Sequence, residues 1–266
     1  YITDNFGEKG KFRFVIAPDD TPYACTCPSC TAIGNTEKNA TPAVTELILR
    51  LSQRFPRHFF FTTSYLTTQQ VTDKQLPPNA GVIVSAINFP LRRIDGKDAK
   101  EKAFAGQLEQ WKNVTKNIYI WDYINNFDDY LTPMPILKIA RQRLQFFKQH
   151  GASGIFFNGS GYSYSSFDEM RTFVLSALLI NPELSVDNLT ASFFNQEYPA
   201  AKKWLYDYYT DLENGTQSGK RLGIYAGIRE SEKAYLTPEK FIKFYDEMND
   251  FVSNAKGKER KKLHEL

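Results

Sequence analysis

The sequence predicts an α/β fold with a parallel sheet, of the kind found in the later part of a (β/α)8 barrel, with C-terminal helices. Three observations support this: short β-rich runs alternate with longer amphipathic stretches, the runs are strongly apolar, and polar residues follow each run. The 266 residues are 42% hydrophobic and 24% charged, which is typical of a globular protein with a sizeable core.

The predicted strands and helices alternate through the first 180 residues. We expect five strands, at residues 11–17, 58–65, 81–87, 117–123 and 154–158. Amphipathic patterns predict helices at residues 44–54, 99–114, 135–149 and 167–180. Strands this apolar, each followed by a helix, indicate a parallel sheet that is buried on both faces.

The number of strands leaves two architectures open. The five predicted strands are three fewer than a closed (β/α)8 barrel contains. Either the sheet is open and doubly wound, or three strands lie upstream of Tyr1, and we favour the upstream strands. After Pro182 the sequence is helical and aromatic-rich, with a loop expected at residues 213–219. We therefore expect a barrel portion at residues 1–182 and a helical segment at residues 183–266 that packs on it.

Composition and motifs exclude several functions. The formal net charge of +3 is too small to predict nucleic-acid binding, and we expect no such partner. No apolar run approaches the roughly 20 residues that a membrane span needs. The sequence lacks a GxGxxG or Walker motif, so nucleotide binding has no support. Four lysines near the C-terminus are interpreted as a solvated helix end: Lys256, Lys258, Lys261 and Lys262.

Polar residues follow every predicted strand, in chain order Asp19 and Asp20, Tyr65, Asn88, Asp122 and Tyr123, and Asn158. In a β/α barrel the active site lies at the carboxyl ends of the strands. Acidic residues after two separate strands, with Tyr and Asn between them, suggest a sugar site. One acidic strand end alone would mean little, because Asp is common in turns and helix caps.

Glycoside hydrolysis requires two carboxyl groups that flank the scissile bond. We expect Asp20, with Asp19 as its neighbour, to supply the acid, and Asp122 to act as nucleophile or stabiliser. The flanking Trp121 and Tyr123 can raise the pKa of a carboxyl group by desolvation and can stack on a pyranose ring. The remaining expected sugar contacts are Tyr65, Asn88 and Asn158. Alternatively, Asp122 caps the following loop or pairs with a buried arginine.

All three cysteines of the chain, Cys25, Cys27 and Cys30, lie after the first predicted strand. Thiolates at this spacing can share a zinc ion, whose fourth ligand would come from a missing segment, His58, an Asp or water. The alternatives are one disulfide with a free thiol, or three free thiols. A structural zinc is favoured over a catalytic one because no HExxH-type pairing accompanies the cysteines.

Four segments together resemble a known family: Ala17-Pro18-Asp19-Asp20, the CxCxxC motif, Trp121-Asp122-Tyr123, and residues 178–183 (LLINPE). The sequence resembles the family described only as domain of unknown function 4838, over about residues 12–209. That resemblance implies relatedness to α-glucuronidase-type glycoside hydrolases with a (β/α)8 barrel. It further implies that the Asp19–Asp20 strand is the fourth and the Asp122 strand the seventh.

The same resemblance implies a periplasmic, cell-surface or secreted protein of glycan-degrading bacteria, whose first strands lie upstream in the same protein. An oxidising compartment would permit a disulfide. Three functional hypotheses follow. The first is a glycoside hydrolase that acts on a polysaccharide or oligosaccharide without a required cofactor. The second is a non-catalytic carbohydrate-binding barrel, and the third is a zinc-stabilised interaction domain.

Overall fold

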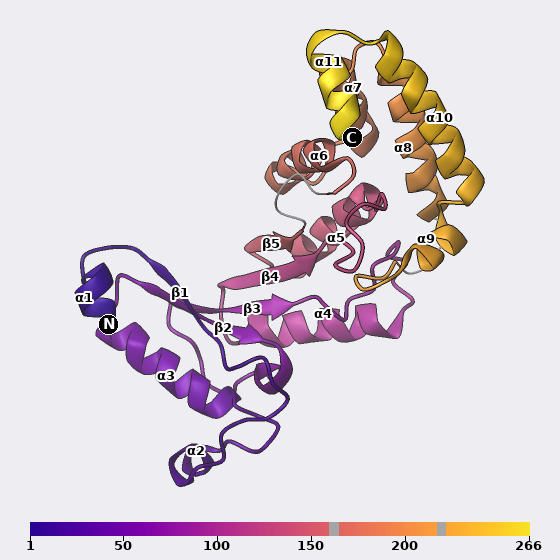
Figure 1. Cartoon of the computed structure of the whole chain (residues 1–266). Helices are drawn as coiled ribbons and strands as arrows, with labels where there is room; N and C mark the ends of the chain where they lie inside the picture. The colour runs from indigo at the N-terminus through magenta and orange to yellow at the C-terminus, as the bar shows by residue number, and fades with distance from the viewer. Residues whose placement is uncertain (160–164, 217–221) are drawn as a thin grey trace. The chain divides into compact units, whose positions relative to one another are not determined.

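The structure is a computed structural model that describes residues 1–159, 165–216 and 222–266 (Figure 1). It divides into two compact units. Unit 1 comprises Tyr1–Phe89, Ala99–Asp122 and Phe147–Phe157, and unit 2 comprises Pro90–Asp98, Tyr123–Phe146 and Asn158–Leu266. Within the described residues, no helix is both long enough and apolar enough to span a membrane.

The five predicted strands are confirmed, and their order in the sheet is their order in the chain. They are β1 (Arg13–Ile16), β2 (Phe59–Ser64), β3 (Ala80–Ser85), β4 (Ile118–Tyr123) and β5 (Gly154–Asn158). All run parallel and form a curled half-barrel, β1-β2-β3-β4-β5. A doubly wound sheet reverses its strand order at a switch point, whereas this sheet shows no reversal. The strand order is therefore that of a barrel segment.

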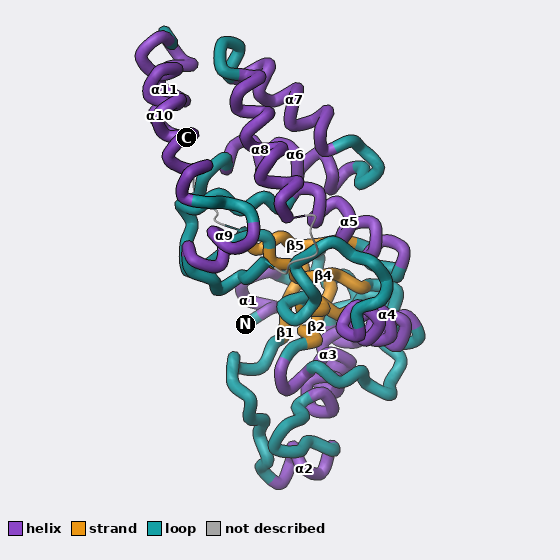
Figure 2. Tube along the Cα trace, turned by 90° about the vertical axis from the view of Figure 1, so that its right-hand side faces the viewer, coloured by secondary structure: helices purple, strands orange, loops and turns teal. Residues whose placement is uncertain are grey.

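The helices follow the expected alternation. Figure 2 distinguishes helices, strands and loops along the chain. Those predicted from periodicity are α3 (Thr41–Arg54), α4 (Ala99–Lys112), α5 (Leu137–Gln149) and α6 (Asp168–Ile180). The region after Pro182 that was expected to be helical contains α7 (Val186–Glu197), α8 (Lys202–Thr216) and α10 (Pro238–Asn254). The loop expected at 213–219 is wrong at its start, because α8 continues to Thr216; residues 217–219 lie outside the described ranges.

Five short elements were not predicted as separate elements: α1 (Ile2–Phe6), α2 (Pro28–Ile33), the 3-10 helix η1 (Leu66–Thr68), α9 (Ile228–Ala234), and α11 (Gly257–Glu265), where only the end of a longer helix was expected. Their lengths explain the omission, because periodicity becomes informative only over windows of about 11–18 residues. Among the first four, α1 and α2 have no buried residue, α9 has one, and η1 buries only two threonines, so local turn chemistry rather than an apolar stripe defines them.

One face of the sheet, here called the helical face, carries the core of unit 1. Phe60 and Ala80 pair across β2 and β3 and pack with Ile48 of α3 in one buried cluster. Farther along β2 on the same face, Ser64 accepts a hydrogen bond of 3.2 Å from the indole N–H of Trp111 in α4. Successive helices thus cover the same face of the sheet, which is the arrangement that a β/α barrel requires.

The opposite face, here called the open face, is built from aromatic rings lying against glycines. The rings of Phe61 and Tyr119 meet edge to face, with 5.1 Å between their centroids. A Cβ atom added at Gly154 would lie 2.5 Å from Cε1 of Tyr119, and one at Gly81 would lie 2.7 Å from Cε1 of Phe61. Glycine is required at Gly154 because the Tyr119 ring occupies the space above it, and at Gly81 because an added Cβ would clash with the backbone carbonyl oxygen of Asn117, which lies closer to it than the Phe61 ring.

Replacing Gly154 by alanine should therefore destabilise unit 1. The added methyl group would displace the Tyr119 ring, and overpacking of this kind costs about 1–3 kcal/mol of unfolding free energy. Gly106→Ala is the matched control, because Gly106 is exposed in α4 and has no heavy atom within 4 Å of an added Cβ. Urea denaturation should show a lower midpoint for G154A and an equal or higher one for G106A. Equal midpoints for G154A and the parent protein would refute the argument.

In unit 2, a buried carboxylate joins α8 to the start of α5. Glu213 accepts hydrogen bonds from the backbone N–H groups of Leu137 at 2.7 Å and Lys138 at 3.1 Å. These are N–H groups of the first helical turn, which have no partner within the helix. Burial raises the pKa of Glu213 to about 7, and the two backbone hydrogen bonds oppose that rise.

The raised pKa of Glu213 predicts a definite pH dependence of stability. Between the usual carboxyl pKa of 4.5 and about 7, the folded state holds the proton more tightly than the unfolded chain. The unfolding free energy should therefore fall as pH rises through this window, by up to about 1.4 kcal/mol per unit. Urea denaturation from pH 4.5 to 8 should show this contribution in the parent protein and its loss in Glu213→Gln. Identical pH profiles for the two proteins would contradict the assignment.

The prediction of a solvated lysine end is wrong for Lys262. This side chain lies in α11 and is only 14% exposed, and its ammonium group pairs with Glu197 at 2.7 Å and also with Glu169. Desolvation alone would lower the pKa of Lys262, but the hydrogen bonds with the two carboxylates raise it above its ordinary value. The sequence pattern did not show this because the two glutamates lie on α6 and α7, far away in the chain.

Candidate functional site

The residues expected at the first two strand ends follow β1 and β2. Asp19 and Asp20 lie beyond Ile16, the last residue of β1, and both are exposed. The carbonyl oxygen of Asp19 accepts a 2.7 Å hydrogen bond from the N–H of Thr21, which turns the chain immediately after the pair. Tyr65 follows β2 directly and is half-buried at the start of η1. These side chains lie at the carboxyl end of the sheet, as predicted.

The third strand end is a tight turn that presents Asn88 to solvent. The N–H of Phe89 donates to the carbonyl oxygen of Ala86 at 2.9 Å, which closes the turn after β3. Asn88 is exposed within this turn, whereas Ala86 and Phe89 are buried. The turn therefore directs a polar side chain outward while its apolar neighbours join the core.

Asp122 lies on the helical face of β4, opposite to its neighbour Trp121. The residues of β4 alternate between buried and half-buried, and Asp122 follows Ile118 and Ile120 in the buried series. Ile118 and Ile120 pair with Val82 and Val84 on the helical face. Asp122 is 0% exposed, so its carboxyl group lies on the helical face. Its role in catalysis stays a prediction.

Trp121 belongs to the opposite, open face, and there it meets a residue that the sequence analysis missed. Its ring contacts Phe156 of β5 edge to face, with centroids 5.0 Å apart. Phe156 is 53% exposed although it lies within a strand. The indole Nε1 of Trp121 is buried and has no hydrogen-bond partner among the described residues. The sequence did contain a signal for Phe156, because alternation along the strand GIFFN places its side chain on the same face as Gly154.

Two further expected sugar contacts, Tyr123 and Asn158, belong to unit 2, where each ends its strand. The N–H of Ile124 donates to the carbonyl oxygen of Asn158 at 3.1 Å, so main-chain pairing continues to the strand ends. The ring of Tyr123 meets that of Phe127 edge to face at 6.1 Å. Both side chains are half-buried, and their contact with sugar stays a prediction.

Arg171 of α6 is a second residue that sequence analysis missed. It is buried, and its guanidinium group donates to the carbonyl oxygen of Ile124 at 2.6 Å and to Oδ1 of Asn125 at 2.9 Å. These bonds hold the chain that follows β4. A sequence signal did exist, because Arg171 shares a helical face with Val174 and Leu178, where an unpaired charge would be unfavourable.

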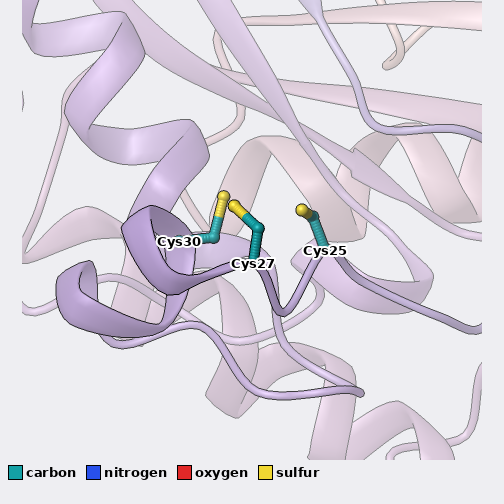
Figure 3. Close-up of side chains that lie close together, drawn as sticks. All are labelled: Cys25, Cys27 and Cys30. Carbon is teal, nitrogen blue, oxygen red and sulfur yellow. The ribbon is translucent and has the colours of Figure 1, made fainter.

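The cysteine cluster, formed by Cys25, Cys27 and Cys30, is a compact group of three sulfur atoms (Figure 3). The three Sγ atoms all lie within 4.8 Å of one another, so this group could hold a metal ion. Cys25 and Cys27 are exposed, and Cys30 is half-buried in α2. Cys27 immediately precedes α2, whose first residue is Pro28. The sequence prediction that these thiols come together is confirmed.

The thiols differ in acidity. A hydrogen bond from the backbone N–H of Cys30, followed by bonds with the thiols of Cys25 and Cys30, lowers the pKa of Cys27. Hydrogen bonds with the thiols of Cys27 and Cys25 raise the pKa of the Cys30 thiol to about 11. Cys27 therefore forms a thiolate more readily than Cys30.

His58 is not the fourth ligand that the sequence left open. It is fully buried where β2 begins, and its Nε2 lies 2.7 Å from the carbonyl oxygen of Gly7. Its Nδ1 accepts a 3.4 Å hydrogen bond from the N–H of Phe12. Both ring nitrogens therefore bond the backbone at the amino end of the sheet, whereas the cysteines follow its carboxyl end.

Comparison with known protein families identifies the family of this chain. Residues 4–211 match the family described as Domain of unknown function (DUF4838), which is well over half of the sequence. The chain belongs to this family. No curated protein matches it. The relatedness to α-glucuronidase-type glycoside hydrolases that the resemblance implied therefore stays a prediction.

The pKa order within the cluster of this DUF4838 member predicts the order of thiol alkylation. Because the thiolate is the reactive form, brief treatment of the metal-free, reduced protein with iodoacetamide at pH 7 should label Cys27 before Cys30. Peptide mass spectrometry at several times measures the order. The unfolded protein is the control, in which the three rates should converge. Labelling of Cys30 before Cys27 in the folded protein would contradict the assignment.

Proposed function

We propose that this chain is part of a glycoside hydrolase whose sugar site lies at the carboxyl edge of the sheet. One observation carries the proposal. The strands are parallel and lie in chain order, so the segments that follow β1 to β4 share one edge. That edge carries an exposed acidic pair, Asp19 and Asp20, and between this pair and β4 it carries Tyr65 just after β2 and Asn88 in the turn after β3. Carboxyl groups beside aromatic and amide side chains suit a hydroxyl-rich ligand.

In this proposal the five strands are the later part of a (β/α)8 barrel, and the first strands lie upstream in the same protein. Val15 and Phe156 support it, because they lie on the open face of the two edge strands and are 51% and 53% exposed. In a closed barrel such inward side chains form a packed core. Strands added at both edges would bury these side chains and pair the free backbone groups of β1 and β5.

The proposed chemistry needs two carboxyl groups and no metal. Asp20 would donate its proton to the departing glycosidic oxygen, and a second carboxylate, which we propose to be Asp122, would stabilise or attack the anomeric carbon. Water would complete hydrolysis and restore the proton to Asp20. A zinc ion at the cysteine cluster would then have a structural role. The exported location that the family resemblance implies is part of the same proposal.

The position of Asp122 favours a second candidate, a carbohydrate-binding barrel without catalysis. Three strand spacings of about 4.8 Å separate β1 from β4 along the sheet, or roughly 14 Å. Catalytic carboxyl pairs lie about 5–9.5 Å apart, so the side chains of Asp20 and Asp122 would both have to point toward the concave side of the sheet to come that close. Asp122 instead lies on the helical face with Ile120, and Trp121 occupies the open face.

Substitutions at Asp20 and Trp121 distinguish the candidates in the full-length protein. A glycan array identifies a bound sugar, and reducing-end release from that glycan measures hydrolysis. If the chain is catalytic, Asp20→Asn should reduce turnover by about 10²–10⁴-fold with binding retained, because a general acid contributes about this much. Asp122→Asn should do the same where thermal unfolding shows that it remains folded. Exposed Asp246 in α10 is the control, and Asp246→Asn should change nothing.

If the site only binds, Trp121→Ala should abolish glycan capture, and the aspartate variants should bind as the parent protein does. Turnover that is unchanged in both Asp20→Asn and Asp122→Asn would remove the hydrolase proposal. Failure of the parent protein to retain any glycan would remove both candidates.

A further inference from the structure

The loop that follows β1 is folded without a core of its own. Residues 19–34, which include α2, contain no buried side chain. Apolar burial therefore cannot supply the free energy that holds this segment in one conformation. Small segments of this kind normally depend on a cross-link, either a disulfide or a bound metal ion.

We propose that Cys25, Cys27 and Cys30 bind one zinc ion as a three-thiolate site that orders the loop of residues 19–34. The separation of the sulfur atoms supports the assignment. Zinc–sulfur bonds of about 2.3 Å at tetrahedral angles put sulfur atoms roughly 3.8 Å apart. The three Sγ atoms already lie within 4.8 Å of one another, so small side-chain rotations bring them to that spacing.

The convergence of three sulfurs, rather than two, favours metal binding over a disulfide. A Cys27–Cys30 disulfide would use two thiols and would not explain why the Sγ atom of Cys25 lies close to the other two. Thiolates are the ligands preferred by zinc and other soft metal ions. Binding one Zn²⁺ replaces the protons of the three thiols, so up to three protons are released per ion.

The backbone around the cluster is held in a conformation that presents the sulfurs. The N–H of Thr31 donates to the carbonyl oxygen of Cys27 at 2.9 Å, and Gly34 ends α2 with a φ of 109°. That left-handed conformation favours glycine and returns the chain toward α3. The N–H of Ala24 donates to the carbonyl oxygen of Glu37 at 2.8 Å, which closes the loop at its base.

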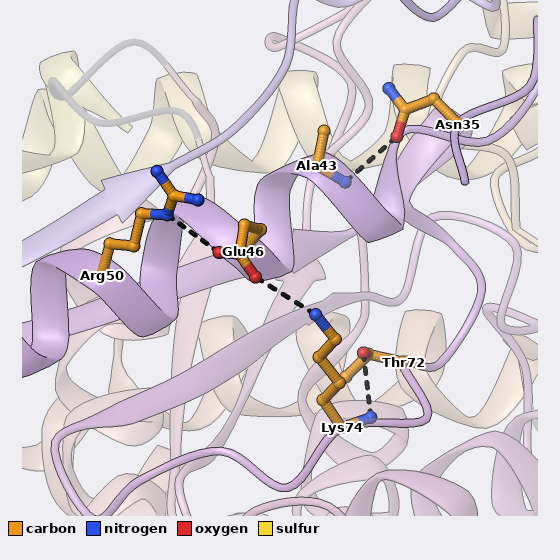
Figure 4. Close-up of polar contacts among 6 residues, drawn as sticks. All are labelled: Asn35, Ala43, Glu46, Arg50, Thr72 and Lys74. Atoms are coloured by element: carbon orange, nitrogen blue, oxygen red, sulfur yellow. Dashed lines mark hydrogen bonds and ion pairs between the residues drawn. The ribbon is translucent and has the colours of Figure 1, made fainter. Parts of the chain in front are cut away.

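Asn35 connects the cluster to the body of unit 1. Its Nδ2 donates to the carbonyl oxygen of Cys25 at 3.2 Å, and its backbone N–H donates to the carbonyl oxygen of Cys30 at 3.0 Å. Its Oδ1 accepts from the N–H of Ala43 in the first turn of α3 at 3.0 Å (Figure 4). Asn35 is therefore a buried positioning residue between two ligand-bearing segments and a core helix.

Among the described residues, the metal-ligating group consists of these three cysteines, without a histidine or carboxylate. The fourth position of a tetrahedral site is then open to a water molecule or to a residue of another segment of the protein. Three thiolates and Zn²⁺ carry a net charge of −1, which a neutral water ligand leaves unchanged.

Metal titration of the reduced, chelator-stripped protein tests the site without any assay of sugar chemistry. The parent protein should bind one Zn²⁺ against a chromogenic competitor, and Co²⁺ as a probe should give sulfur-to-metal charge-transfer absorption. Cys27→Ser and the triple serine variant should lose both signals. Because these side chains lie outside the core, thermal unfolding of metal-free parent and variants should coincide.

Asn35→Asp gives a sharper test of the positioning role. The aspartate can still accept from Ala43 but cannot donate to Cys25, so zinc affinity should fall by about 10–100-fold, as for other residues that orient metal ligands. Amide hydrogen exchange in residues 19–34 should slow on zinc addition in the parent protein and not in Cys27→Ser. A Cys27–Cys30 disulfide in the purified protein with no zinc uptake after reduction would overturn the proposal, as would unchanged zinc binding in Cys27→Ser.

Discussion

Parallel pairing of five strands in chain order is the constraint on which the rest of the structure depends. Each connection must return from the carboxyl end of one strand to the amino end of the next, and α3 and α4 do so over the same face. The carboxyl ends are therefore left to loops, free of the packing that fixes the helices. The exposed acidic pair and the cysteine cluster both lie in the first of these loops, after β1. Backbone pairing thus decides which residues are available for chemistry and which are committed to the core.

Local pattern was sufficient to predict the strands and the longer helices. GIFFN at 154–158 forms β5 over the same residues, and helix α3 begins three residues earlier than its apolar periodicity indicates, at Thr41-Pro42. Proline is favourable at the start of a helix, so this boundary was readable from turn chemistry. The convergence of the three cysteines also followed from spacing, since residues so close in sequence are brought together by one short helix.

Long-range partners and side-chain direction could not be predicted in the same way. Glu213 and Lys262 each meet partners more than 60 residues away, and no local pattern encodes such a meeting. Asp122 shows a different difficulty. Strand end and residue type suggested chemistry, but alternation along β4 sends its carboxyl group to the helical face. The face of β4 on which Asp122 lies can be derived from its alternation with Ile118 and Ile120, but its position at a strand end does not give that face. A candidate site residue in a strand should therefore be judged by the alternation of side chains along that strand as well as by its place at the strand end.

The link that Asn35 makes between this loop and α3 has a consequence for the substitutions that the loop can tolerate. Because residues 19–34 contain no buried side chain, substitutions there meet less steric constraint than substitutions at Gly81 and Gly154. New side chains can be sampled beside Asp19 and Asp20 while the scaffold keeps its full stability. With Asn35, the acidic pair and the three cysteines retained, the other positions of this loop can change ligand contacts without a change in the fold of the sheet.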